Sequence, residues 1–203
     1  MTPVLFLDID GVLNSQAYFD RGAVPGHSWA SGIERERVTL INRIVEATGA
    51  PVVICSDWRH LLTLSTLRKL FRRQGFVGRI LGTTNALRNA DRGLECAAWL
   101  ASTRRPIDAF AAIDDRWDFF DIRSRHVRPN PLRGISDKDA DRAIRILRRS
   151  AKTAIARFRT LANDLRADTV VVRTRVDVRP QRAGRVLEEV YARIYPKLVT
   201  VPC

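Results

Sequence analysis

The chain of 203 residues contains 45% hydrophobic and 28% charged residues, which is typical of a globular protein with one domain, or one domain and an appendage. No apolar run approaches the ~18 residues that a membrane-spanning helix needs, and the amino terminus lacks the pattern of a signal peptide. The three cysteines are widely separated and form no CxxC pair, so we expect neither a disulfide framework nor a zinc site. These features predict a cytoplasmic protein with no membrane partner.

The first predicted element is a strand at residues 3–8 that ends in paired acids. Asp8 and Asp10 are two residues apart, so an extended backbone places both on one side, and Gly11 permits a sharp turn after them. Close carboxylates repel each other and favour a hard cation such as Mg²⁺. One aspartate can act as a nucleophile while a second acts as general acid and base. The pattern indicates phosphoryl transfer; the alternative is an ordinary strand end with polar turn residues.

The segment at residues 4–14 resembles motif I of the haloacid dehalogenase (HAD) superfamily of phosphohydrolases. The resemblance implies three further stretches: a strand ending in Ser or Thr that binds the phosphoryl group, a positive residue near a helix start, and a strand ending in acids that complete a magnesium site. The matching residues are Ser56, Arg92, Asp114 and Asp115. Arg88 competes with Arg92 for the positive role, and either of the two acids could bind the metal.

Two residues near the second motif have alternative readings. Ser56 could cap the helix that follows it, in addition to binding phosphate. Arg59 could hold a second phosphate through its guanidinium group, or it could be an ordinary solvated arginine. We expect Trp58 to pack on the sheet; the alternative is that it stacks on a base.

Strands and helices alternate along the first two thirds of the chain. We predict strands at residues 3–8, 51–55, 79–81, 109–113 and 122–127, and helices at 34–48, 58–73 and 91–102. This alternation favours a parallel sheet with helices on both faces and a ligand site at the carboxyl ends of the strands. Residues 14–33 have no clear period and read as a loop or flap that is too short for a full cap. The predicted fold class is therefore α/β and Rossmann-like, with a minimal cap or none.

The neighbours of these motifs narrow the resemblance. Ser-x-Trp-Arg at 56–59, Arg-Gly-x-Glu at 92–95 and Gly-Ile-Ser at 134–136 resemble the HAD domains of Swiss Army Knife RNA-repair proteins over about residues 1–150. The resemblance implies a Mg²⁺-dependent phosphatase acting on a phosphomonoester, and the repair context implies a phosphate on a nucleic-acid end. It also implies a nucleophile (Asp8), a general acid and base (Asp10), phosphate ligands (Ser56, Arg92, Arg59) and metal ligands (Asp8, Asp10, Asp114, Asp115). Nucleotides and small metabolites remain open as substrates.

The carboxyl-terminal part is harder to interpret. Ser136 and Asp139 resemble a capping box, and an apolar stripe predicts one long helix at 137–166 that packs within the molecule or joins two copies as a homodimer. The stripe consists of Ala140, Ile144, Leu147, Ala151, Ala154, Phe158, Leu161 and Leu165. A strand at 169–178, a helix at 181–194 and a short strand at 198–201 follow. We divide the chain into a HAD-like domain at 1–150 and an extension of unknown family at 151–203, continuous with the last helix.

The excess positive charge is concentrated in one segment. Residues 123–185 carry 18 basic and 6 acidic side chains, whereas residues 1–122 carry 15 and 14. A basic segment beside a phosphatase site would attract RNA or DNA, although the 31 arginines against 4 lysines also indicate compositional bias. The alternative to an enzyme is a nucleic-acid-binding or dimerising protein that uses the HAD domain as a scaffold.

Overall fold

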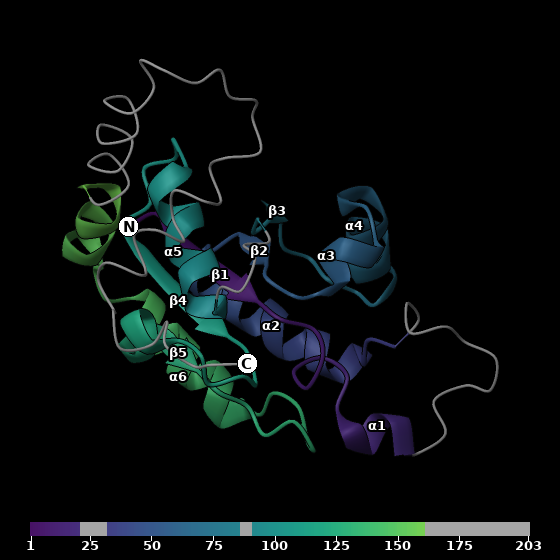
Figure 1. Cartoon of the computed structure of the whole chain (residues 1–203). Helices are drawn as coiled ribbons and strands as arrows, with labels where there is room; N and C mark the ends of the chain where they lie inside the picture. The colour runs from purple at the N-terminus through teal and green to yellow at the C-terminus, as the bar shows by residue number, and fades with distance from the viewer. Residues whose placement is uncertain (21–31, 86–90, 161–203) are drawn as a thin grey trace, which may run out of the picture.

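The computed structural model describes residues 1–20, 32–85 and 91–160. Its centre is a sheet of five parallel strands in the order β3-β2-β1-β4-β5 (Figure 1). The strands are β1 (Pro3–Leu7), β2 (Val52–Ile54), β3 (Ile80–Thr83), β4 (Ala109–Ile113) and β5 (His126–Val127). Successive strands are added on one side of β1 and then on the other. This order confirms the predicted Rossmann-like α/β fold.

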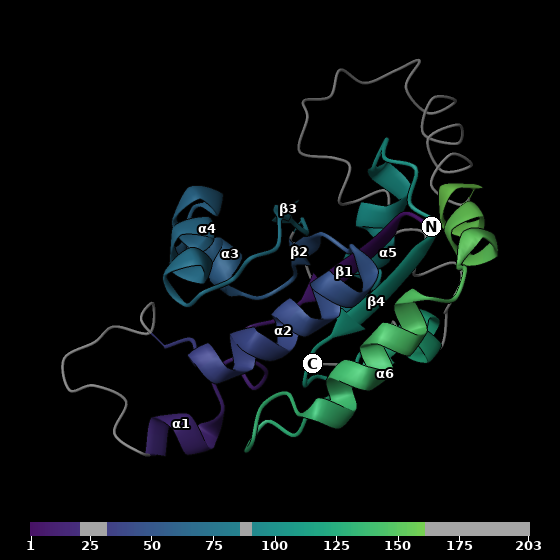
Figure 2. The same ribbon diagram turned by 180° about the vertical axis from the view of Figure 1, so that it is seen from behind.

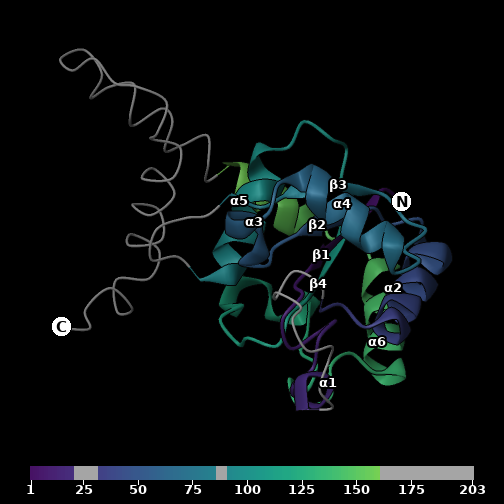
Figure 3. The ribbon, with the colours of Figure 1, turned by 90° about the vertical axis from the view of Figure 1, so that its right-hand side faces the viewer.

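Two cores sandwich the sheet because successive side chains of a strand point to opposite faces. Leu5 and Leu7 of β1 belong to one core, and Val4 and Phe6 belong to the other. The first core includes residues of α2 (Arg35–Thr48), α4 (Leu64–Arg73) and α6 (Asp137–Leu147), and the second includes residues of α5 (Arg92–Ser102) and the 3-10 helix η2 (Phe120–Arg125). Figure 2 shows α2 and α6 side by side on the first face, and Figure 3 shows α5 on the opposite side of the sheet.

Three predicted elements differ from the structure. The helix predicted at 58–73 is two helices, α3 (Trp58–Leu61) and α4, because Leu62 and Thr63 are extended and the Thr63 hydroxyl accepts a hydrogen bond from the Thr66 N–H at 3.2 Å. The strand predicted at 122–127 is reduced to β5, since η2 occupies the preceding residues. A short helix, α1 (Gln16–Asp20), lies within the predicted loop at 14–33.

The single helix predicted at 137–166 is wrong. The capping box of Ser136 and Asp139 begins α6 as expected, but α6 ends at Leu147 and a separate helix runs through 152–160. Leu147 packs in the first core, whereas Ile155 packs in the second. The chain therefore passes around the sheet between the two helices, and one straight apolar stripe cannot serve both faces.

The break between these helices has a visible stabilising contact. The guanidinium group of Arg125 donates to the carbonyl oxygens of Ile146 and Arg149 at 3.1 and 2.7 Å, and also to that of Ser150. These are carbonyls that a continuing helix would have used for its own hydrogen bonds. A side chain distant in the sequence thus satisfies the end of α6.

Several predictions fall on residues outside the described part of the chain. These are the last turns of the predicted long helix, the elements at 169–178, 181–194 and 198–201, and Arg88. The division at residue 150 and the homodimer stay predictions. Among the described helices, none combines the length and the apolar character needed to cross a bilayer.

Candidate active site

The strand register brings the predicted residues to one end of the sheet. Leu7 of β1 is aligned with Ile54 of β2 and Ile113 of β4. The residues that follow these three therefore leave the sheet at the same level, which places Asp8, Ser56 and Asp114 around one space. This is the carboxyl end of the strands, where open α/β sheets bind their ligands.

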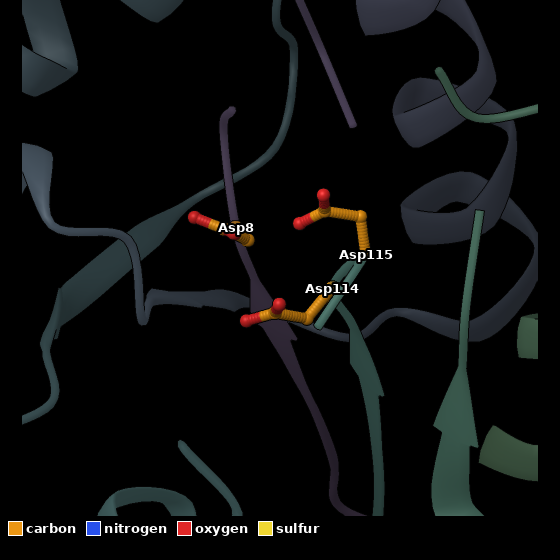
Figure 4. A group of neighbouring side chains, drawn as sticks. All are labelled: Asp8, Asp114 and Asp115. Atoms are coloured by element: carbon orange, nitrogen blue, oxygen red, sulfur yellow. The ribbon is translucent and has the colours of Figure 1, made fainter. Parts of the chain in front are cut away.

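Three carboxylates form the centre of the site. Asp8 follows β1, Asp114 and Asp115 follow β4, and one oxygen of each lies within 4.8 Å of the others (Figure 4). Gly11 allows this approach, because its φ of 69° is in the left-handed region and an added Cβ would lie 2.5 Å from Oδ2 of Asp115. The turn after Asp8 therefore requires glycine for both its backbone angle and its space.

The proximity and burial of these acids change their protonation. Burial raises the pKa of Asp8 to about 6, although Arg92 and a hydrogen bond from the Ile9 N–H lower it. Burial and the neighbouring carboxylate of Asp8 raise the pKa of Asp114 well above its usual range. The pKa of Asp115 is also raised, first by its burial. Burial thus opposes the ionisation of all three carboxyl groups, and Arg92 only partly offsets this for Asp8 and Asp114.

A divalent cation fits this donor set. All three ligands are hard carboxylate oxygens, which Mg²⁺ prefers, and a cation would offset both the burial of the carboxylates, which is the main cause of their raised pKa values, and the repulsion between them. The described cluster contains no cysteine or histidine ligand of the kind that a zinc site would use.

Ser56 and Arg92 border the carboxylates. Ser56 is completely buried; its hydrogen bond with Asp8 lowers the pKa of that carboxyl, and its hydroxyl accepts from the Trp58 N–H at 3.4 Å. The N-cap of α3 is Asp57, so the prediction that Ser56 occupies this position is wrong, although its hydroxyl accepts from the first N–H of the helix while it borders the site. Arg92 begins α5, is almost fully buried, and lies with Nε 3.4 Å from Oδ2 of Asp114. It supplies positive charge directly beside the acid cluster.

Asp10 stands apart from the three clustered acids. Its carboxylate accepts hydrogen bonds from the Trp58 indole N–H at 2.9 and 3.0 Å and from the Asn14 side-chain amide at 2.8 Å. Among the described residues its oxygens do not belong to the metal-binding group. Sequence reasoning missed both donors, although the Ser-x-Trp spacing already placed an indole two residues after Ser56.

Arg59 lies among protein acceptors. Its Nη1 donates to the carbonyl oxygens of Cys55 and Ser56 at 2.8 and 2.9 Å, and its Nη2 donates to Glu95 at 2.7 Å. Glu95 also pairs with Arg92 at 3.3 Å. Both terminal nitrogens of Arg59 are therefore engaged in holding the turn after β2. The Arg-Gly-x-Glu spacing was the available signal for Glu95, because residues three apart on a helix are neighbours.

The parallel sheet and the acids at its carboxyl end define a HAD-superfamily domain. A model of the HAD domain in Swiss Army Knife RNA repair proteins matches residues 4–140, and the chain belongs to this family. No curated protein and no solved structure matches the sequence. The family supports a phosphohydrolase type of function, and the match confirms the resemblance inferred from the motifs.

Proposed function

We propose that this protein is a Mg²⁺-dependent phosphomonoester hydrolase that acts through an aspartyl-phosphate intermediate. The observation that carries the proposal is the cluster of Asp8, Asp114 and Asp115 beside Ser56 and Arg92. These residues combine a nucleophile, a cation site and donors for phosphoryl oxygens. When bound by the three carboxylates, Mg²⁺ would supply positive charge that allows an anionic phosphate to approach them.

In the first step, a carboxylate oxygen of Asp8 attacks phosphorus. Oδ1 of Asp8 already accepts from the Ile9 N–H at 2.8 Å, so Oδ2 is the oxygen we assign to the attack. The ester oxygen leaves with its bonding electrons and takes a proton from Asp10. The Ser56 hydroxyl holds a phosphoryl oxygen. The terminal nitrogens of Arg92 already bond to the Cys55 carbonyl, Glu95 and Asp57, so Arg92 stabilises the developing charge through Nε, which has no hydrogen bond within the described residues.

In the second step, the carboxylate of Asp10 removes a proton from water, and the water attacks the phosphorus of the aspartyl-phosphate. Phosphate leaves and Asp8 is regenerated. The indole N–H of Trp58 and the amide of Asn14 hold the Asp10 carboxylate in one position for both proton transfers. We assign Arg59 a positioning role, because it holds the Cys55 and Ser56 carbonyls rather than leaving its nitrogens for a second phosphate.

The catalytic proposal is tested with an aryl phosphate and Mg²⁺. Wild-type protein should release phosphate, Asp8→Asn should fall to background, and the exposed control Asp141→Asn should match wild type. Equal background turnover in all three proteins would eliminate this substrate class.

The substrate proposal is a phosphate on a nucleic-acid end. It is supported by the family, whose described context is RNA repair, and by the basic residues 123–160, which carry 12 basic and 3 acidic side chains. A panel of 5′- and 3′-phosphorylated oligonucleotides, nucleotides and small phosphorylated metabolites would rank kcat/KM. A preference for the metabolites would reject the nucleic-acid substrate while leaving the chemistry intact.

A second candidate function is nucleic-acid binding without catalysis, supported by the same basic segment. Replacing Arg145, Arg148 and Arg149 with glutamine should weaken RNA binding and reduce its salt dependence. Unchanged, salt-insensitive binding would remove the role of this segment. Binding by a protein that has no phosphatase activity would favour the second candidate.

A further inference from the structure

A groove lined by arginines lies away from the proposed active site. It is lined by residues of α4, of β3 and of the loop between them, together with Arg105 from the segment before β4; Figure 1 labels α4 and β3. The lining includes Arg68, Arg72, Arg79, Arg105, Phe76 and Ile80. We call it the arginine groove. Its arginines all come from residues 1–122. Basic and acidic side chains are nearly equal in number there, so the charge distribution along the sequence did not predict this groove.

The arginine groove is at the opposite end of the strands from the acid cluster. Arg79 immediately precedes β3, and Arg105 lies in the segment that leads into β4. The site acids, in contrast, follow the strands. Because β3 has four residues and a strand rises ~3.3 Å per residue, the groove belongs to a different part of the surface from the reacting groups.

The charge of the arginine groove is not balanced within the described residues. No carboxylate lines it, and none of its four arginines forms an ion pair with a described acid. Other described arginines do have such partners, including Arg43, Arg59 and Arg116. Four neighbouring cations without an anion create a strongly positive potential that attracts anionic ligands.

The arginines also differ in how they are held. Arg68 donates through Nε and Nη2 to the carbonyl oxygen of Ile80 at 3.1 and 2.8 Å, so it is fixed along β3, the edge strand of the sheet. Arg72, Arg79 and Arg105 are exposed. Phe76 and Ile80 are buried beneath them and offer little aromatic surface for stacking. The available contacts are therefore mainly electrostatic.

The arginine groove adjoins the basic helix at 152–160. Arg159 of that helix donates through Nη2 to the carbonyl oxygen of Arg105 at 3.2 Å, and Lys152 and Arg157 belong to the same helix. The guanidinium group of Arg159 therefore lies beside the backbone of a groove residue and adds positive charge next to Arg105.

We propose that the arginine groove binds the phosphodiester backbone of a single-stranded nucleic acid. Guanidinium groups bind phosphate oxygens in pairs of hydrogen bonds, and a groove with several of them matches a strand that carries repeated phosphates better than it matches a flat lipid surface. The lack of exposed stacking surface makes this contact independent of base sequence. The inference goes beyond the proposed phosphatase activity and does not require it.

The test measures binding of a short fluorescein-labelled single-stranded RNA without terminal phosphates, in a series of salt concentrations. Replacing Arg72, Arg79 and Arg105 with glutamine should weaken binding about tenfold or more and reduce the slope of log K against log salt by about 2 to 3, because each lost phosphate contact removes ~0.7–0.9 from the slope. Replacing their sequence neighbours Lys69, Arg73 and Arg104 is the matched control, since it removes equal charge outside the groove.

Both triple variants should keep the melting temperature and the aryl phosphate hydrolysis of wild type. The RNA measurements are repeated with Asp8→Asn, so that loss of catalysis and loss of the groove are distinguished. The proposal is overturned if both triple variants weaken RNA binding equally, or if the groove variant binds RNA as tightly as wild type. It is also overturned if the groove variant loses binding to phosphatidylserine vesicles but still binds RNA.

Discussion

The carboxylate of Asp8 is almost completely buried beside two other acids, and this position determines its response to pH. Its pKa is raised from the usual 3.8 to about 6. The folded protein therefore binds this proton more tightly than the unfolded chain, so the stability that Asp8 contributes is present at low pH. In the metal-free protein it is lost as pH rises between about 4 and 6.

Asp8→Asn should consequently raise the melting temperature of the metal-free protein near neutral pH and change it little near pH 4. The ionised carboxyl costs up to ~3 kcal/mol at neutral pH by the size of its shift, and asparagine can still accept the Ile9 N–H bond. Differential scanning fluorimetry with a chelator measures the effect, with Asp141→Asn as the exposed control. Equal stability of wild type and Asp8→Asn at neutral pH would contradict the assigned burial cost.

Trp58 has two roles, packing in the core and hydrogen bonding to Asp10, and the sequence predicted only the packing. It packs in the first core and donates its indole N–H to Asp10. Trp58→Phe should retain much of the packing but release the carboxylate, so we expect kcat to fall about tenfold while KM changes little, given ~1.5–3 kcal/mol for a hydrogen bond to a charged group.

Steady-state hydrolysis of an aryl phosphate measures both constants. Trp99→Phe is the matched control, because Trp99 packs edge-on against Phe6 at 5.5 Å and lies against the second core rather than the first. An equal loss of kcat in both variants would show that the indole bond to Asp10 has no special role.

At the scale of elements, ion pairs join the start of α3 to α5. Arg59 follows β2, Arg92 and Glu95 occupy the first turns of α5, and all three side chains are at most 6% exposed. Breaking a buried ion pair by removing one charge is costly because the partner charges remain buried. The network therefore holds the turn of Ser56 against the helix that carries Arg92.

Glu95→Gln should destabilise the fold by ~3–5 kcal/mol, since two buried guanidinium groups would lose the buried carboxylate that they share and keep in common only the exposed Asp57. Urea unfolding followed by tryptophan fluorescence measures the change. Glu46→Gln makes the same chemical substitution at an exposed position of α2 and should change stability by less than ~0.5 kcal/mol. A similar small effect at Glu95 would mean that the network is not structural.

At the scale of the whole molecule, the separate strands β1 and β4 supply one anionic cluster, so metal binding and folding should be coupled. Mg²⁺ at about 100 times its dissociation constant should stabilise the wild-type protein by ~2.7 kcal/mol. A double variant with Asp8→Asn and Asp115→Asn should lose this response. Thermal melts with Mg²⁺ and with a chelator provide the measurement, and an equal shift in both proteins would place the ion elsewhere.

Most of the sheet could be predicted from local sequence patterns. Five-residue apolar runs such as β1 and β4 can be recognised because strands buried on both faces need continuous apolar residues. Their acidic ends then predicted Asp8 and Asp114 at one end of a parallel sheet. The long helix at 137–166 could not be interpreted correctly, because a heptad-like stripe does not reveal that Leu147 and Ile155 pack on opposite faces.

The sequence by itself determined the fold class and the paired acids with their order along the chain, because these depend on local periodicity and on residue types. Only the tertiary structure decided the partners of each side chain: the indole that holds Asp10, the carbonyls that occupy Arg59 and the arginines that meet beside β3. Trp58 and Asp10 are 48 positions apart and the groove arginines lie between residues 68 and 105, so packing alone determines their distances. The bonds of Arg59 to the carbonyls of Cys55 and Ser56 are local in sequence, but their direction depends on how the chain turns after β2.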